Sequence, residues 1–109
     1  QLGLKNWKNM KNSNKELDGF KRILDEIYEL KTRKAKTYGE TWRVFGIQGI
    51  YSEIGRKFSR LWINKSKDPK EIDFETLIDS LTDLAVYAIM ARQLIEEKDT
   101  EDKILKLLK

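Results

Sequence analysis

The stretch Leu84-Ala85-Val86-Tyr87-Ala88-Ile89-Met90-Ala91 decides the fold that we expect for this chain of 109 residues. None of its eight side chains is charged, and it continues an apolar spacing of three and four residues that begins at Phe74. That spacing is typical of an amphipathic helix, and a helix that is apolar on every side is buried on every side. The sequence therefore predicts a helix over 73–97 that is covered on two faces.

The two faces of this predicted helix differ in composition. The main core face is expected to hold nine apolar residues, namely Phe74, Leu77, Ile78, Leu81, Leu84, Ala85, Ala88, Ile89 and Ile95. The back face carries two acids followed by two apolar residues, namely Asp79, Asp83, Val86 and Met90. Because Val86 and Met90 also need cover, we predict a homo-oligomer formed through this third helix.

The rest of the chain is also read as helical. Apolar spacing predicts helices over 16–35 and 48–64, separated by a loop at 37–42 that interrupts the period. A polar connection at 64–70 precedes a helix start at Asp68 or Asp73, and Thr100 is expected to cap a last segment over 100–109. We find no internal repeat or heptad series. The predicted fold is all-α, a small up-down bundle of three to four helices, with residues 1–15 as a flexible segment and 16–109 as one domain.

Composition excludes several kinds of chemistry. The chain has no Cys and no His, so disulfides, Cys or His zinc sites and His-assisted nucleophiles are ruled out. A bound metal would have to be held by carboxylates, which favour a hard cation such as Mg²⁺, or Mn²⁺ as the alternative.

Charge is unevenly distributed along the chain. Residues 1–15 hold four of the 22 basic residues and none of the 18 acidic ones, so the remainder is neutral. A short lysine-rich end is more typical of a solvated terminus than of a nucleic-acid-binding arm. Because the sequence shows neither a membrane-spanning stretch nor a signal peptide, we expect a cytoplasmic protein without a membrane partner.

Acidic residues form the first candidate site. Asp79 and Asp83 lie four residues apart on one helix face, where they could share a divalent ion with Glu53 from the preceding helix. The alternative is structural: Glu53 pairs with Lys57, and basic residues from another helix neutralise the two aspartates.

Aromatic and basic residues form the other candidates. Tyr38, Gly39 and Trp42 in the predicted loop could stack on a base, or the two aromatics could close one end of the bundle. Three cations on the second helix could bind phosphate or form a solvated flank, namely Arg56, Lys57 and Arg60.

Residues 34–96 resemble a known family. The carriers of the resemblance are Lys36-Thr37-Tyr38-Gly39-Glu40-Thr41-Trp42, then Glu53-Ile54-Gly55-Arg56-Lys57 with Arg60, then Asp79-Ser80-Leu81-Thr82-Asp83-Leu84-Ala85-Val86-Tyr87-Ala88. They look like the nucleotide-modification-associated helical domain of phages and bacteria, which is similar to the MazG-like all-α nucleotide pyrophosphohydrolases. The resemblance implies a bundle that completes its site by oligomerising, Mg²⁺ on helix carboxylates and a nucleotide ligand. Two positions depart from the family pattern, because Thr37 and Arg56 stand where an acid is usual.

These observations lead to two functional hypotheses. In the first, the chain is a metal-dependent nucleotide pyrophosphohydrolase or a nucleotide-binding protein. Glu53, Asp79 and Asp83 would then hold the metal and carry catalysis. The nucleotide would be bound by five residues, namely Tyr38, Gly39, Trp42, Lys57 and Arg60. In the second hypothesis, the chain is a non-catalytic helical oligomerisation module.

Overall fold

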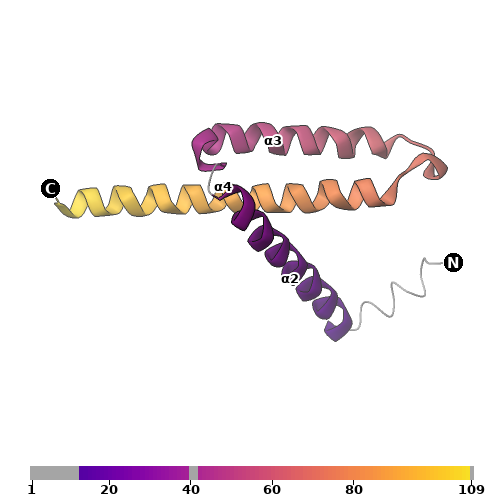
Figure 1. Cartoon of the computed structure of the whole chain (residues 1–109), viewed down its shortest axis with the longest axis horizontal. Helices are drawn as coiled ribbons and strands as arrows, with labels where there is room; N and C mark the ends of the chain where they lie inside the picture. Colours follow the sequence, from indigo (N-terminus) through magenta and orange to yellow (C-terminus); the bar gives the residue numbers. More distant parts are fainter. Residues whose placement is uncertain (1–12, 40–41, 109) are drawn as a thin grey trace. The chain divides into compact units, whose positions relative to one another are not determined.

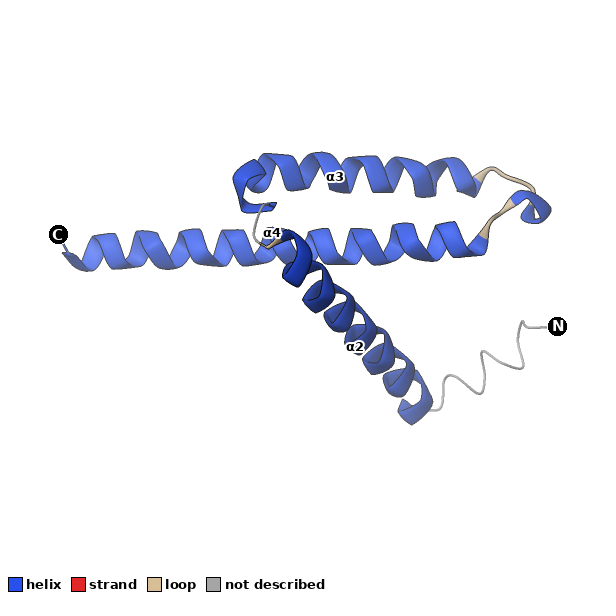
Figure 2. Cartoon of the chain, viewed as in Figure 1, coloured by secondary structure: helices blue, strands red, loops and turns tan. Residues whose placement is uncertain are grey.

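The structure is a computed structural model that describes residues 13–39 and 42–108. Its described elements are three α-helices and one turn of 3-10 helix, in the order α2, α3, η1, α4 (Figure 2). This confirms the prediction of an all-α chain for the described residues. They divide into two compact units between residues 39 and 40, so α2 belongs to the first unit and α3, η1 and α4 belong to the second.

Helix α2 spans Ser13–Tyr38, which is longer at both ends than the predicted 16–35. Two ion pairs lie on its exposed surface, and each joins residues one helical turn apart: Lys21–Asp25 at 2.9 Å and Arg22–Glu26 at 2.7 Å. The helix ends at Gly39, whose φ of 61° is left-handed and whose amide donates to the Ala35 carbonyl at 2.9 Å. A glycine in this conformation is a common way to end a helix. It places a break inside the predicted loop 37–42, but that loop was drawn too wide, because α2 extends to Tyr38 and the next helix begins at Trp42 and not at 48.

Helices α3 (Trp42–Lys65) and α4 (Phe74–Leu108) form an antiparallel hairpin (Figure 1). The connection contains the 3-10 turn η1 (Pro69–Glu71), where the Asp68 carboxylate accepts from the Lys70 amide at 3.0 Å. Asp73 then caps α4, accepting from the Glu75 amide at 3.1 Å. Both predicted helix starts are therefore confirmed, and each satisfies backbone N–H groups that have no partner within a helix.

A seam of residues spaced three and four apart joins the two helices. On α3 every member is buried or half-buried: Ile47, Ile50, Ile54, Lys57, Leu61 and Asn64. On α4 the corresponding residues are Leu77, Ser80, Leu84, Tyr87, Ala91 and Leu94. This is the heptad spacing of coiled-coil packing, so the statement that the chain has no heptad series was wrong. Lys57, Asn64 and Ser80 interrupt the apolar pattern, which is why the repeat escaped detection.

The core of the hairpin is small and involves the predicted back face of α4 together with only part of the face that was expected, Leu77 and Leu84. Its buried apolar residues are Ile50, Met90 and Ala91, and Val86 packs against them. Most large residues of the predicted core face are instead exposed: Phe74 64%, Ile78 61%, Leu81 50%, Ile89 47% and Ile95 54%. The prediction was wrong because an all-round apolar helix does not reveal which face meets its neighbour. Met90 is covered by its own chain and does not need a second copy.

The end of α4 continues past the predicted boundary. Thr100 is not a cap, since its hydroxyl donates to the Glu96 carbonyl at 3.0 Å inside one continuous helix. Residues 98–108 are all exposed and are supported by two ion pairs, Lys98–Asp102 at 3.1 Å and Lys103–Asp99 at 2.9 Å. Across 13–39 and 42–108, none of the helices combines the length and apolarity that crossing a membrane requires.

Candidate functional site

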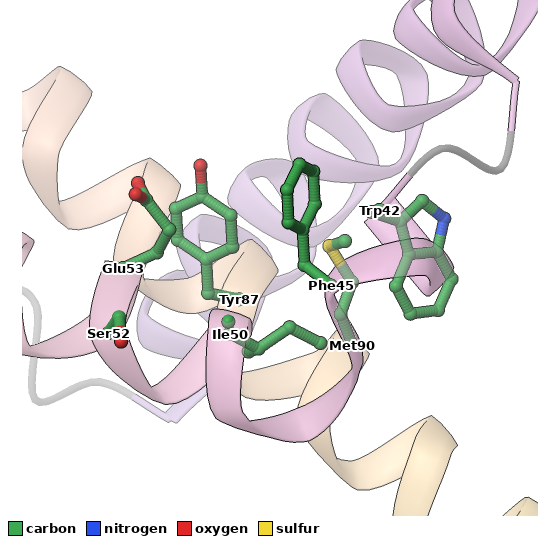
Figure 3. Close-up of a pocket in the computed structure, with 8 residues that line it drawn as sticks. Trp42, Phe45, Ile50, Ser52, Glu53, Tyr87 and Met90 are labelled. Carbon is green, nitrogen blue, oxygen red and sulfur yellow. The ribbon is translucent and has the colours of Figure 1, made fainter.

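A hollow of about 450 Å³ lies on one side of the hairpin, where α3 begins and α4 passes beside it. Its lining is mostly aromatic and apolar, with one carboxylate: Trp42, Phe45, Gly49, Ile50, Ser52, Glu53, Tyr87 and Met90. Figure 3 shows the Glu53 carboxylate beside the Tyr87 hydroxyl, with Phe45 standing over Met90. An apolar hollow with a few polar groups, here the Glu53 carboxylate and the Ser52 and Tyr87 hydroxyls, is the usual form of a small-molecule site.

A backbone break in α3 positions the two aromatic residues at the start of that helix. Gly46 has φ 63° and ψ −166°, a conformation essentially restricted to glycine, and it separates the turn Trp42–Phe45 from the rest of α3. Gly49 is needed for a different reason, because a Cβ there would lie 2.4 Å from the Phe45 Cβ. The two glycines together let Phe45 pack closely against the helix that follows it.

An ion pair holds this turn against α4. Arg43 Nη2 donates to Glu97 Oε1 at 2.9 Å, and Arg43 Nη1 contacts the other carboxylate oxygen. The guanidinium also lies 4.6 Å from the centre of the Trp42 ring. The hydrogen bond from Arg43 lowers the pKa of Glu97. A two-point Arg–carboxylate contact restricts geometry as well as supplying energy, so it holds Trp42 at the hollow.

The predicted acidic site contains an ion pair at its centre. Lys57 is buried in the seam, and its Nζ lies 2.8 Å from Asp83 Oδ2. A buried ammonium group needs such a partner, because desolvation otherwise penalises its charge. Asp79 is exposed, one helical turn before Asp83. The structural alternative is therefore observed for Asp83.

Glu53 bonds to a different cation from the one expected. Arg56 Nη2 lies 2.6 Å from Glu53 Oε2, while Lys57 is directed to Asp83. This bond from Arg56 is the main cause of the lowered pKa of Glu53, and a weaker hydrogen bond from Tyr87 acts in the same direction. Burial raises the pKa of Tyr87, and the negative charges of Glu53 and Asp83 add to that rise. At neutral pH the Tyr87 hydroxyl is therefore neutral and donates a hydrogen bond, while the Glu53 carboxylate is ionised and accepts it.

The three predicted metal ligands therefore do not form a ready-made set. Over residues 13–39 and 42–108, no group of three or more acidic side chains is placed to hold a metal ion. Glu53 and Asp83 both contact cations, and to bind a metal each would have to exchange that cation for it.

The predicted nucleotide-binding residues are placed differently from one another. Trp42 lines the hollow, Lys57 is engaged with Asp83, and Arg60 is exposed on α3. Tyr38 and Gly39 belong to the first unit, as the last residue of α2 and the glycine that ends it. The side chain of Tyr38 lies outside the described residues, as do residues 1–12 of the predicted flexible segment.

Sequence reasoning missed most of the hollow. Phe45, Ser52, Tyr87 and Met90 line it, whereas the sequence places Tyr87 in the apolar run and Met90 on the back face of the third helix. Gly46 and Gly49 were the available signal, since two glycines at the start of a helix suggested a turn. Nothing local could have paired Arg43 with Glu97, which lies 54 residues away.

Comparison with known proteins adds no assignment to this geometry. The chain matches no protein-family model, no curated protein and no solved structure.

Proposed function

We propose that this chain is a nucleotide-binding protein whose base site is the aromatic hollow at the start of α3. The observation that supports the proposal is that Trp42, Phe45 and Tyr87 line one hollow together with a half-buried carboxylate, Glu53. Aromatic faces stack on any nucleobase, and an ionised carboxylate accepts hydrogen bonds from base N–H groups. Arg56 contacts Glu53 and supplies a cation beside the hollow for phosphate.

The enzymatic form of the proposal is Mg²⁺-dependent hydrolysis, as the family resemblance implies. It requires Glu53 and Asp83 to exchange Arg56 and Lys57 for metal when nucleotide binds. Binding without turnover needs no such exchange, and we therefore place nucleotide binding first.

Titration of the full chain with ATP, GTP, CTP and UTP, by calorimetry with and without Mg²⁺, tests the proposal. We expect at least one nucleotide to bind, and Trp42→Leu to weaken that binding about 10- to 100-fold through lost stacking. Tyr28→Leu is the control, because Tyr28 is a 75% exposed aromatic residue on α2. Released phosphate or pyrophosphate, measured in parallel, separates turnover from binding.

Failure of all four nucleotides to bind at millimolar concentration would overturn the proposal. It would leave the second candidate function, a non-catalytic helical interaction module. The exposed apolar residues of α4, such as Ile78 and Leu81, favour that alternative, because a hairpin with so small a core leaves a large apolar area in water.

A further inference from the structure

The hairpin has two flanks of opposite character, one on each side of the seam. Glu53 immediately precedes a seam residue of α3 and contacts Tyr87, a seam residue of α4. Asp83 immediately precedes a seam residue of α4 and contacts Lys57, a seam residue of α3. Residues that precede a seam position therefore share one flank, which holds the hollow. Since each residue advances about 100° around a helix, residues that follow a seam position lie on the other flank.

This other side, which we call the apolar flank, ends at a cation on each helix, Lys65 after Asn64 and Arg92 after Ala91, but the nine residues between these ends that define it are uncharged. They are Tyr51, Gly55, Phe58 and Trp62 on α3, with Phe74, Ile78, Leu81, Ala85 and Ala88 on α4. Its six large side chains are between 49% and 64% exposed. Phe58 and Trp62 stack with their ring centres 5.9 Å apart, so they present one continuous aromatic surface.

Gly55 gives an independent indication of an external contact. A Cβ built on this residue would meet no atom within 4 Å, so nothing in the described chain requires a glycine there. Glycine inside a helix costs about 0.5–1 kcal/mol relative to alanine. Gly49 shows the contrast, because Phe45 leaves no room for its Cβ. The missing side chain at Gly55 opens a notch between the aromatic residues of the apolar flank.

We propose that the apolar flank is the interface with a second copy of this chain, related by a two-fold axis, with Gly55 receiving a bulky side chain of that copy. A large aromatic side chain has an area of about 150–250 Å², and the six large residues of the flank are about half exposed, so together they offer roughly 500–800 Å². That is about the share of one partner in a standard protein interface. The area is sufficient for a stable dimer.

The arrangement of side-chain sizes is what selects an identical copy. Large aromatic residues line α3, while α4 contributes small ones at Ala85 and Ala88. A two-fold axis places the same patch on both partners, so each aromatic stripe can lie on the small residues of the other copy. The two cations lie at the ends of the flank, where Lys65 lies over the Trp62 ring and Arg92 is paired with Glu96. The uncharged middle of the flank therefore brings no like charges together when two copies meet. This inference is independent of nucleotide binding.

Sedimentation equilibrium of the full chain tests the interface. We expect a dimer at micromolar concentration, and Gly55→Gln and Ala88→Gln each to raise the dimer Kd about 10- to 100-fold by overfilling the interface. Ser59→Gln is the matched control, because Ser59 is exposed on α3 and lies on the side away from the seam. Circular dichroism confirms that each variant keeps its helical content.

Two results would overturn the proposal. One is a wild type that stays monomeric at 200 µM, which is on the order of 100-fold above the concentration at which a micromolar dimer forms. That result would show that the flank is exposed or covered by the chain's own α2. A dimer that survives both Gly55→Gln and Ala88→Gln would place the interface elsewhere. Dissociation by these two variants, with Ser59→Gln unaffected, supports it.

Discussion

At the scale of single residues, the contact between Lys57 and Asp83 explains why a polar pair interrupts an otherwise apolar seam. The lysine is 7% exposed, and its stem packs where a heptad expects an apolar residue. A buried polar residue in such a seam costs stability but restricts the register in which helices pair. We infer that this pair helps align α3 with α4.

The substitution Asp83→Asn should destabilise the protein by about 1–3 kcal/mol, because the buried Lys57 ammonium loses its ionic partner. Urea unfolding measures the change, with Asp79→Asn as the control at an exposed position, where an effect within about 0.5 kcal/mol is expected. If Asp83 served a metal site, the same change would instead relieve like-charge repulsion with Asp79. Two results together would contradict the structural role of Asp83: Mg²⁺ stabilises the wild type, and Asp83→Asn is more stable than the wild type but no longer responds to Mg²⁺.

Gly46 provides a second prediction at the residue scale. Its backbone conformation is strained for any residue with a Cβ, so Gly46→Ala should cost about 1–3 kcal/mol. Gly19→Ala is the control, because Gly19 is helical and a Cβ there would meet nothing within 4 Å. The free energy of unfolding should fall only for the first variant, and equal effects would show that Gly46 is not the break in α3.

At the scale of elements, the ion pair between Arg43 and Glu97 connects the first turn of α3 to α4. The hydrogen bond from Arg43 lowers the pKa of Glu97 below its usual range. A carboxyl with a lower pKa in the folded state stabilises the fold above its unfolded pKa and loses that effect as the pH falls through the folded value. This contribution is therefore complete at neutral pH and disappears in acid.

We expect the melting temperature of the wild type to fall on acidification below about pH 4.3, the usual pKa of a glutamate. Glu97→Gln should melt lower than the wild type at pH 7, and the difference should shrink as the pH approaches 2. Differential scanning calorimetry across this range checks the prediction. A difference that is unchanged at pH 2 would show that the ionised form of Glu97 does not matter.

At the scale of the whole molecule, the small hairpin core has a thermodynamic consequence. Only three apolar residues of the described chain are buried, so hairpin packing alone supplies little stability. Folding of such a unit is coupled to association when the partner covers the remaining apolar surface.

The melting temperature should accordingly rise with protein concentration, since association favours the folded state. Circular dichroism can monitor thermal unfolding at 2 µM and at 200 µM to measure the effect. These concentrations lie roughly on either side of a micromolar dissociation constant. Gly55→Gln should reduce the concentration dependence, whereas Ser59→Gln should retain it. A wild-type melting temperature that is the same at both concentrations would show that the hairpin is stable without a partner.

Local features of this protein could be predicted from its sequence by itself. The helical content, the break before Trp42 and the capping roles of Asp68 and Asp73 depend on neighbouring residues along the chain. Apolar spacing, a glycine cap and an aspartate cap act over three or four residues, so they need no knowledge of the fold.

The tertiary structure decided which face of α4 is inside and what the candidate site contains. Apolar spacing gives the angle of a residue around its own helix, but it does not say which angle faces a neighbour. Met90, on the predicted back face, is therefore buried, while Leu81, on the predicted core face, is exposed. Asp83 finds Lys57 on another helix, and Arg43 finds Glu97, because three-dimensional packing brings together charges that are distant in the sequence.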